Sequence, residues 1–121
     1  MSTSAAVYIV ALDKAVRINA DGFPDSTGVA LERIVSEGLL ESFARHDEYS
    51  FLSRTGADYD TYAADKFSNR YVKVDQVGFA FPEDDSAEIS ATLEDGVYVF
   101  DSYENYNYVI HTDGVVALQK R

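Results

Sequence analysis

Two Asp-Gly dipeptides, at residues 95–96 and 113–114, limit what this chain can fold into more than any other feature of its sequence. Asp-Gly between alternating apolar and polar residues is typical of a two-residue β-hairpin turn, because both central residues take a positive φ. The alternation predicts strands on both sides of each turn, at residues 87–93, 97–101, 106–111 and 115–119. We therefore expect the C-terminal half to form a run of antiparallel strands.

A two-residue turn at 95–96 also determines which residues lie opposite one another. Leu93 then pairs with Tyr98, and Ala91 with Phe100, which predicts the hairpin face that packs on a core. The opposite face suits solvent better, and its expected pairs are Thr92–Val99, Ser90–Asp101 and Glu88–Tyr103.

The strand expected at 106–111 has two faces, one with Tyr106 and Tyr108 and the other with Val109. The sequence does not decide between them by itself. The apolar residues Val116 and Leu118 of the following strand favour an inward Val109. We therefore expect Tyr106 and Tyr108 to lie on the surface.

The N-terminal half combines short strands with helices. Residues 5–12 form an apolar run rich in β-branched residues, which predicts a buried strand, and a second short strand is expected through Val16 and Ile18. Apolar residues at helical spacing predict an amphipathic helix over 27–45, which Gly38 weakens and can divide. A shorter helix is expected at 59–68 and a long strand at 71–81, with a β-bulge near 75–76 that corrects a shift in its apolar phase.

These elements together predict an α+β fold in a single domain over residues 1–121. One long and one short helix are expected to precede an antiparallel sheet of about five strands in the C-terminal half. No apolar stretch approaches the roughly 18 residues that a membrane-spanning helix needs. The N-terminus lacks a basic region, and cysteine is absent, so we expect a cytoplasmic protein, in the host cytoplasm if it is phage-encoded.

The charge is distributed very unevenly along the chain. Residues 74–119 contain no Lys or Arg but carry ten carboxylates and seven aromatic rings, whereas residues 1–73 carry eleven acids and eight bases. A field of one sign, at a net charge of −11, steers a protein towards cationic partners and away from nucleic acid and anionic membranes. The alternative interpretation is that the acids only keep the protein soluble.

Carboxylates and tyrosines concentrate in the acidic segment, and we expect them to form a partner-binding face. Tyrosine supplies contact area and a hydroxyl group at small entropic cost, and carboxylates complement Lys and Arg on a partner. The candidate residues are Glu83, Asp84, Asp85, Glu88, Glu94, Asp101, Tyr103, Glu104, Tyr106 and Tyr108. The alternative is that the tyrosines are half-buried strand residues and that the acids merely solvate the sheet.

Catalytic and metal-binding patterns are weak. His46, Asp47 and Ser50 have the residue types of a catalytic triad, but neighbours in one segment do not easily reach its geometry. Two acidic stretches, 19–25 and 58–65, resemble parts of an EF-hand loop but lack the glycine at the sixth and the glutamate at the twelfth position. We therefore expect no enzymatic activity, no cofactor and no metal, although a bound calcium ion is left open.

The leading functional hypothesis is a small acidic inhibitor that masks the basic, nucleic-acid-binding surface of a partner protein. Phage inhibitors of CRISPR or restriction defence act in this way, through nucleic-acid mimicry, and immunity proteins against nuclease toxins are the first alternative. A homo-oligomeric assembly protein that uses an exposed sheet edge is the second alternative. An enzyme or small-ligand sensor with an acidic pocket is a third. No direct contact with nucleic acid or a membrane is expected.

Overall fold

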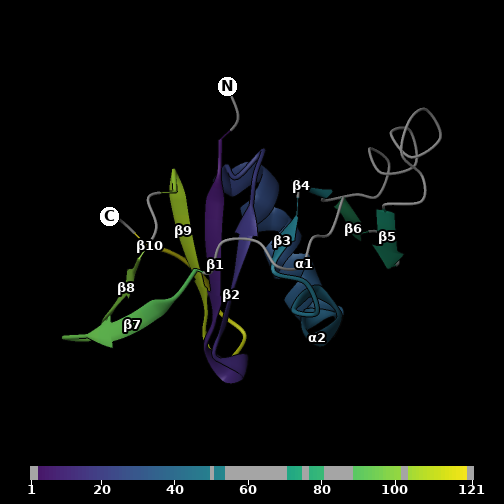
Figure 1. Cartoon of the computed structure of the whole chain (residues 1–121). Helices are drawn as coiled ribbons and strands as arrows, with labels where there is room; N and C mark the ends of the chain where they lie inside the picture. Colours follow the sequence, from purple (N-terminus) through teal and green to yellow (C-terminus); the bar gives the residue numbers. More distant parts are fainter. Residues whose placement is uncertain are drawn as a thin grey trace.

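The computed structural model describes residues 3–49, 51–53, 71–74, 77–80, 89–101 and 104–119. Its central element is a five-stranded sheet in the order β10-β9-β1-β2-β3 (Figure 1). The strands are β1 (Ala5–Ile9), β2 (Lys14–Ile18), β3 (Glu48–Tyr49), β9 (Tyr106–Ile110) and β10 (Val116–Gln119). The described part of the chain is therefore a mixed α/β fold.

The sheet is mixed, so the prediction of an antiparallel sheet confined to the C-terminal half is wrong. Strand β1 is antiparallel to β2 but parallel to β9, and β2 is parallel to β3. All five residues of β1 are buried, so this strand needs cover on both faces and neighbours on both sides. The central position between β9 and β2 meets that need, and it brings three N-terminal strands into the sheet.

Helices cover one face of the sheet. A short π-helix, η2 (Pro24–Gly28), leads directly into α1 (Val29–Ser36), and α2 (Leu40–Phe43) follows. Gly38 lies between α1 and α2 with a φ of 73°, a conformation that glycine adopts at little cost. The helix expected over 27–45 is thus divided at the glycine that the sequence singled out.

The main hydrophobic core lies between this face and the helices. Val7 and Ile9 of β1, with Ile110 of β9, are almost completely buried there. From the helices, Leu31, Ile34 and Phe43 close the same cluster. Each such side chain contributes about 1.5–3 kcal/mol on burial, so this layer is the main source of stability in the described chain.

The chain reverses direction in the segment where a long strand with a bulge was expected. Strand β5 (Tyr71–Val74) pairs antiparallel with β6 (Val77–Ala80), and β4 (Phe51–Ser53) pairs with the other side of β6. Residues 74 and 77 are direct cross-strand partners. The single long strand expected over 71–81 is therefore wrong, because 72 lies opposite 79 and 74 opposite 77. The position of the expected bulge, 75–76, lies outside the described residues.

The hairpin at the first Asp-Gly has the predicted register. Strands β7 (Ala91–Glu94) and β8 (Val97–Phe100) pair with Leu93 opposite Tyr98 and Thr92 opposite Val99. Both turn residues have positive φ, 51° and 79°, as a type I′ turn requires. The hairpin is a separate two-stranded sheet on the side of the main sheet away from the helices (Figure 1).

The second Asp-Gly lies in a three-residue connection and not in the two-residue turn that was expected. The His111 amide donates a hydrogen bond to Val115 O at 2.9 Å, so residues 112–114 form the loop between β9 and β10. Gly114 has a φ of 88°, as is typical of the residue that ends such a loop. Strands β9 and β10 are antiparallel partners, as predicted.

The helix expected at 59–68 lies outside the described residues. Within the described ranges, the helices are all too short, or not apolar enough, to cross a bilayer.

Candidate functional site

The hairpin β7–β8 has an exposed side with both apolar and acidic residues. We call this side, formed by Thr92, Glu94, Val97 and Val99, the hairpin outer face. Val97 and Val99 are 50% and 47% exposed, and Glu94 lies directly opposite Val97. Asp95 in the turn adds a second exposed carboxylate. Val97 and Val99 thus lie on the same face and are both open to solvent.

The inner side of the hairpin packs on the second face of the main sheet. The Tyr98 ring lies 5.2 Å from the Tyr8 ring and 6.2 Å from the His111 ring, measured between centroids. The side-chain amide of Gln119 donates a hydrogen bond to the Tyr98 carbonyl oxygen. These contacts hold the hairpin against β1, β9 and β10. Leu93 is an exception to the predicted core face, because it is 58% exposed.

A cavity of about 390 Å³ remains between the hairpin and the edge of the main sheet. Its lining is mostly apolar, with Val109 and Leu118 among the contributors, and His111 and Gln119 supply polar groups. Val97, beside the turn, borders both this cavity and the hairpin outer face. Strands β8, β9 and β10 each provide part of the wall.

The predicted binding residues divide into three groups. Glu94 and Asp101 are exposed on the hairpin, where they were expected. Glu104, Tyr106 and Tyr108 belong to the main sheet or the residues leading into it. Five candidates lie outside the described residues: Glu83, Asp84, Asp85, Glu88 and Tyr103.

Asp101 closes the open end of the hairpin. Its carboxylate accepts hydrogen bonds from the Ser90 amide at 2.8 Å and the Ser90 hydroxyl at 3.0 Å. The Ser90 amide, followed by the Ser90 hydroxyl, holds the pKa of Asp101 below its usual value. The expected Ser90–Asp101 pairing is confirmed, and Asp101 therefore shapes the hairpin in addition to charging it.

Glu104 is buried and not part of an exposed acidic face. Only 4% of the residue is exposed, and its Oε1 atom lies 3.4 Å from Nε of Arg17, which also lies 3.8 Å from Glu48 Oε1. Strand β2 runs beside β1, whose first residues lie next to the start of β9, and this brings residues 17 and 104 together. Glu104 is thus an internal ion-pair partner that anchors the entry to β9.

Tyr108 is also buried, so the expectation that it lies on the surface is wrong. It is 1% exposed, and its hydroxyl group donates a 2.6 Å hydrogen bond to the Gly22 carbonyl oxygen. Burial, followed by the charges of Tyr106 and Asp25, raises the pKa of Tyr108. Tyr106 is half-buried, with its ring 5.9 Å from that of Phe23. Val109 is buried as well, because β9 lies inside the sheet and is covered on both faces.

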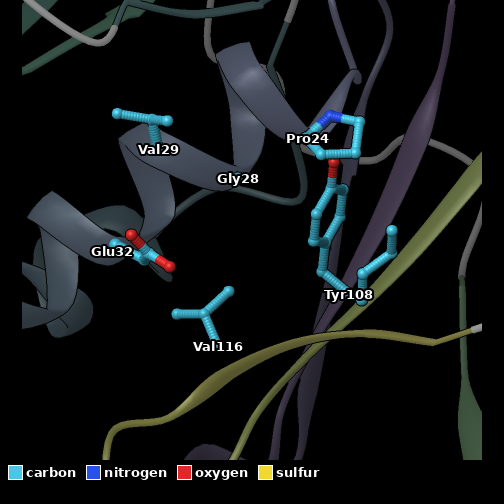
Figure 2. Close-up of a pocket in the computed structure, with 7 residues that line it drawn as sticks. Pro24, Gly28, Val29, Glu32, Tyr108 and Val116 are labelled. Carbon is cyan, nitrogen blue, oxygen red and sulfur yellow. The ribbon is translucent and has the colours of Figure 1, made fainter.

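A second concave surface lies between α1 and the outermost strand β10 (Figure 2). We call it the edge groove. It has a volume of about 130 Å³ and is lined by Pro24, Gly28, Val29, Glu32, Tyr108, Val116 and Leu118. Figure 2 shows Glu32 on the helix side of the groove and Val116 and the Tyr108 ring on the strand side. Leu118 lines both the edge groove and the cavity under the hairpin.

Sequence reasoning missed the exposed valines and the edge groove. The signal for Val99 was present, because the predicted register already placed an apolar residue on the wet face of the hairpin. The edge groove had no comparable signal. It depends on α1 and β10 lying side by side, and residues 29–32 and 116–118 are far apart in the sequence.

Residues considered for catalysis have structural contacts. The His46 ring lies edge-on to Tyr49 at 5.9 Å, Asp47 pairs with Lys14 at 3.2 Å, and Ser50 lies outside the described residues. Among the residues that the structure describes, no group of three or more His, Asp or Glu side chains could hold a metal ion. No family model, curated protein or solved structure matches this chain.

Proposed function

We propose that this protein binds a basic partner protein through the hairpin outer face. The observation that carries the proposal is the exposure of Val97 and Val99 beside Glu94, in a segment of 46 residues without a Lys or Arg. Apolar side chains that lose water on docking supply affinity, and carboxylates around them select a cationic surface. Within the described chain, Glu94 and Asp95 make no ion pair and are available to a partner.

The charge distribution supports a nucleic-acid-handling protein as the partner. Grooves that hold a phosphate backbone are lined with Lys and Arg, and an acidic face on a protein whose net charge is −11 complements them. A protein that occupies such a groove inhibits its owner by competition. A phage inhibitor of bacterial defence and an immunity protein against a nuclease toxin are two forms of this function, and both use the same physical recognition.

Charge should govern the rate of association with the partner, and apolar contact the rate of dissociation. Replacing Glu94 by Lys should slow association and reduce its dependence on salt, because long-range attraction acts before contact. Replacing Val99 by Thr should speed dissociation, because a hydroxyl group enters the apolar contact while the side-chain shape is kept. Both residues are exposed, so neither change should disturb folding.

The first experiment is affinity capture from a lysate of the cells in which the protein occurs, on the immobilised wild type and the Glu94→Lys/Val99→Thr variant. We expect the wild type to retain a nucleic-acid-binding protein that elutes as the salt concentration rises, and the variant to lose it. A Glu41→Lys variant, changed at an exposed position of α2, controls for net charge. Equal capture by all three proteins, or capture of no basic protein, would contradict the proposal.

A further inference from the structure

The backbone of β10 presents an unpaired edge beside the edge groove. The His111 amide donates to Val115 O, and bonded pairs alternate along an antiparallel ladder, so residues 115, 117 and 119 bond to β9. Val116 and Leu118 consequently direct their N–H and C=O groups away from β9. In the part of the chain that the structure describes, no strand pairs with this outer side of β10.

The side chains of the groove fit an added strand. An extended peptide beside β10 places every second side chain on the helix side of the sheet, where Glu32 lies on the helix side of the groove and Val29 contributes to its lining. Val29 is 38% exposed and Leu118 is 46% exposed, so both have apolar surface to cover. The groove volume of about 130 Å³ is close to the roughly 150 Å³ of apolar cavities that take up benzene. It therefore suits one apolar side chain.

The acidic residues around the groove favour a peptide that carries Lys or Arg. Glu32 lines the groove, and Asp25 lies near enough to Tyr108 to act on it electrostatically. A second copy of this chain would bring the same carboxylates together at a pair of β10 edges and is disfavoured by repulsion. A segment with Lys or Arg two residues from its apolar side chain meets Glu32 instead, because alternate residues lie on the same face.

We propose that the edge groove binds an extended, cationic segment of a partner protein, which adds to the main sheet as a sixth strand along β10. The main-chain groups of Val116 and Leu118 pair with the segment, an apolar side chain of the segment fills the groove beside Val29, and a Lys or Arg pairs with Glu32. Strand addition of this kind obtains affinity from main-chain hydrogen bonds and specificity from pockets for alternate side chains. The inference stands independently of the hairpin outer face, because it uses different residues.

The test uses the full chain and a displayed library of random short peptides as the probe. We expect enriched peptides to share a Lys or Arg two residues from a β-branched or other apolar residue. Glu32→Lys should weaken an enriched peptide by about two- to fivefold, the range expected for one exposed ion pair. The control Glu41→Lys makes the same change of net charge elsewhere and should leave the affinity unchanged.

Amide hydrogen exchange distinguishes strand addition from simple filling of the groove. The Val116 and Leu118 amides should exchange rapidly in the free protein and slowly with the peptide bound, while the Ala117 amide stays protected by β9 throughout. Slow exchange at Val116 and Leu118 in the free, dilute protein would show that the edge is already paired and would overturn the proposal. Concentration-dependent protection would identify a second copy as the occupant, with the same consequence.

Two further outcomes also test strand addition at β10. Failure to enrich any basic peptide, or a bound peptide that leaves the Val116 and Leu118 amides unchanged, would refute strand addition. The Glu94→Lys/Val99→Thr variant should bind the peptide as the wild type does. A loss confined to that variant would place the peptide on the hairpin outer face and not in the edge groove.

Discussion

The two faces of the main sheet are covered in different ways. On the helix side, fully buried aliphatic and aromatic side chains from β1, β2 and β9 pack against α1 and α2. On the other side, Tyr8 and Val109 are buried next to polar residues, among them Arg17 and Asn107, and a hairpin with an exposed outer face packs over part of the strands. The difference indicates that the helix side provides most of the stability, whereas the hairpin side keeps apolar and acidic side chains exposed.

The charged residues show the same division. The ion pairs in the described chain join Lys14, Arg17 and Arg33 to nearby acids, all on the elements of the main sheet and helices or next to them. The carboxylates of Glu94 and Asp95 have no such base among the described residues. Described bases therefore offset part of the acidity of the main sheet and helices and none of that of the hairpin.

The largest loss of folding stability is expected from a substitution in the core on the helix side of the main sheet. Ile34→Ala removes a fully buried side chain and should lower the free energy of unfolding by about 3 kcal/mol. Val99→Ala on the hairpin outer face should change it by less than about 0.5 kcal/mol, because the side chain is already in contact with water. Urea denaturation of both variants measures the difference. Equal losses would show that the hairpin belongs to the same cooperative core.

The second-largest loss of folding stability is expected from breaking the ion pair between Arg17 and the buried Glu104. Glu104→Gln leaves Arg17 without its closest carboxylate and should cost about 2 kcal/mol. The arginine side chain is 36% exposed, so solvent reduces the loss below that of a fully buried pair. Glu37→Gln, in the surface pair with Arg33, should cost about 0.3 kcal/mol. A double-mutant cycle with Arg17→Met isolates the pair, and a coupling energy near zero would contradict this assignment.

The Tyr8 hydroxyl should have a smaller effect that depends on pH. It donates a 2.7 Å hydrogen bond to Asp13, which together with burial raises the pKa of Tyr8 to about 12. The folded state thus holds this proton more tightly than the unfolded chain, whose tyrosine pKa is about 10. The contribution is complete below pH 10 and is lost as the pH rises through 12.

Tyr8→Phe should therefore cost about 1 kcal/mol at neutral pH. The stability difference from the wild type should shrink as the pH rises from about 10 to 12. Denaturation of both proteins across this range measures it, and the comparison cancels the titration of the other tyrosines. A difference that does not change with pH would argue against the Asp13 hydrogen bond as the cause.

The smallest effect is expected at the open end of the hairpin. Asp101→Asn weakens the bonds to Ser90 and should lower stability by less than about 1 kcal/mol at pH 7. The folded-state pKa of Asp101 is lowered, so its contribution is present above the unfolded value of about 3.9 and is lost as the pH falls through the folded value. A variant that stays less stable than the wild type by the same amount in acid would show that the charge of Asp101 is not involved.

Local features of the fold were predictable where neighbouring residues alone decide the conformation. The Asp95-Gly96 turn has the positive φ values of its type, and the register that follows from it places Thr92 opposite Val99 as expected. The division of the first helix at Gly38 has the same origin. In each case the conformation depends on a few adjacent residues, so no distant contact was needed to infer it.

The predictions failed where a distant segment provides the cover. Tyr108 was assigned to the surface because the apolar residues Val116 and Leu118 favoured an inward Val109, and Glu104 because carboxylates and tyrosines concentrate in the acidic segment. Strand β1 pairs with β9 in parallel, and the Gly22 carbonyl oxygen, just before η2, accepts the Tyr108 hydrogen bond. These two segments bury that region instead. Short-range alternation carries no information about a partner strand that lies a hundred residues away.

The sequence by itself determined the Asp95-Gly96 hairpin, the antiparallel pair at the second Asp-Gly, the helix break and the excess of acid in the C-terminal half, because each depends on residues close together in the chain. Only the tertiary structure decided which acids and tyrosines are buried, and it alone created the edge groove between α1 and β10. Burial depends on which elements pack together, and the pairing of β1 with β9 depends on contacts between segments about a hundred residues apart.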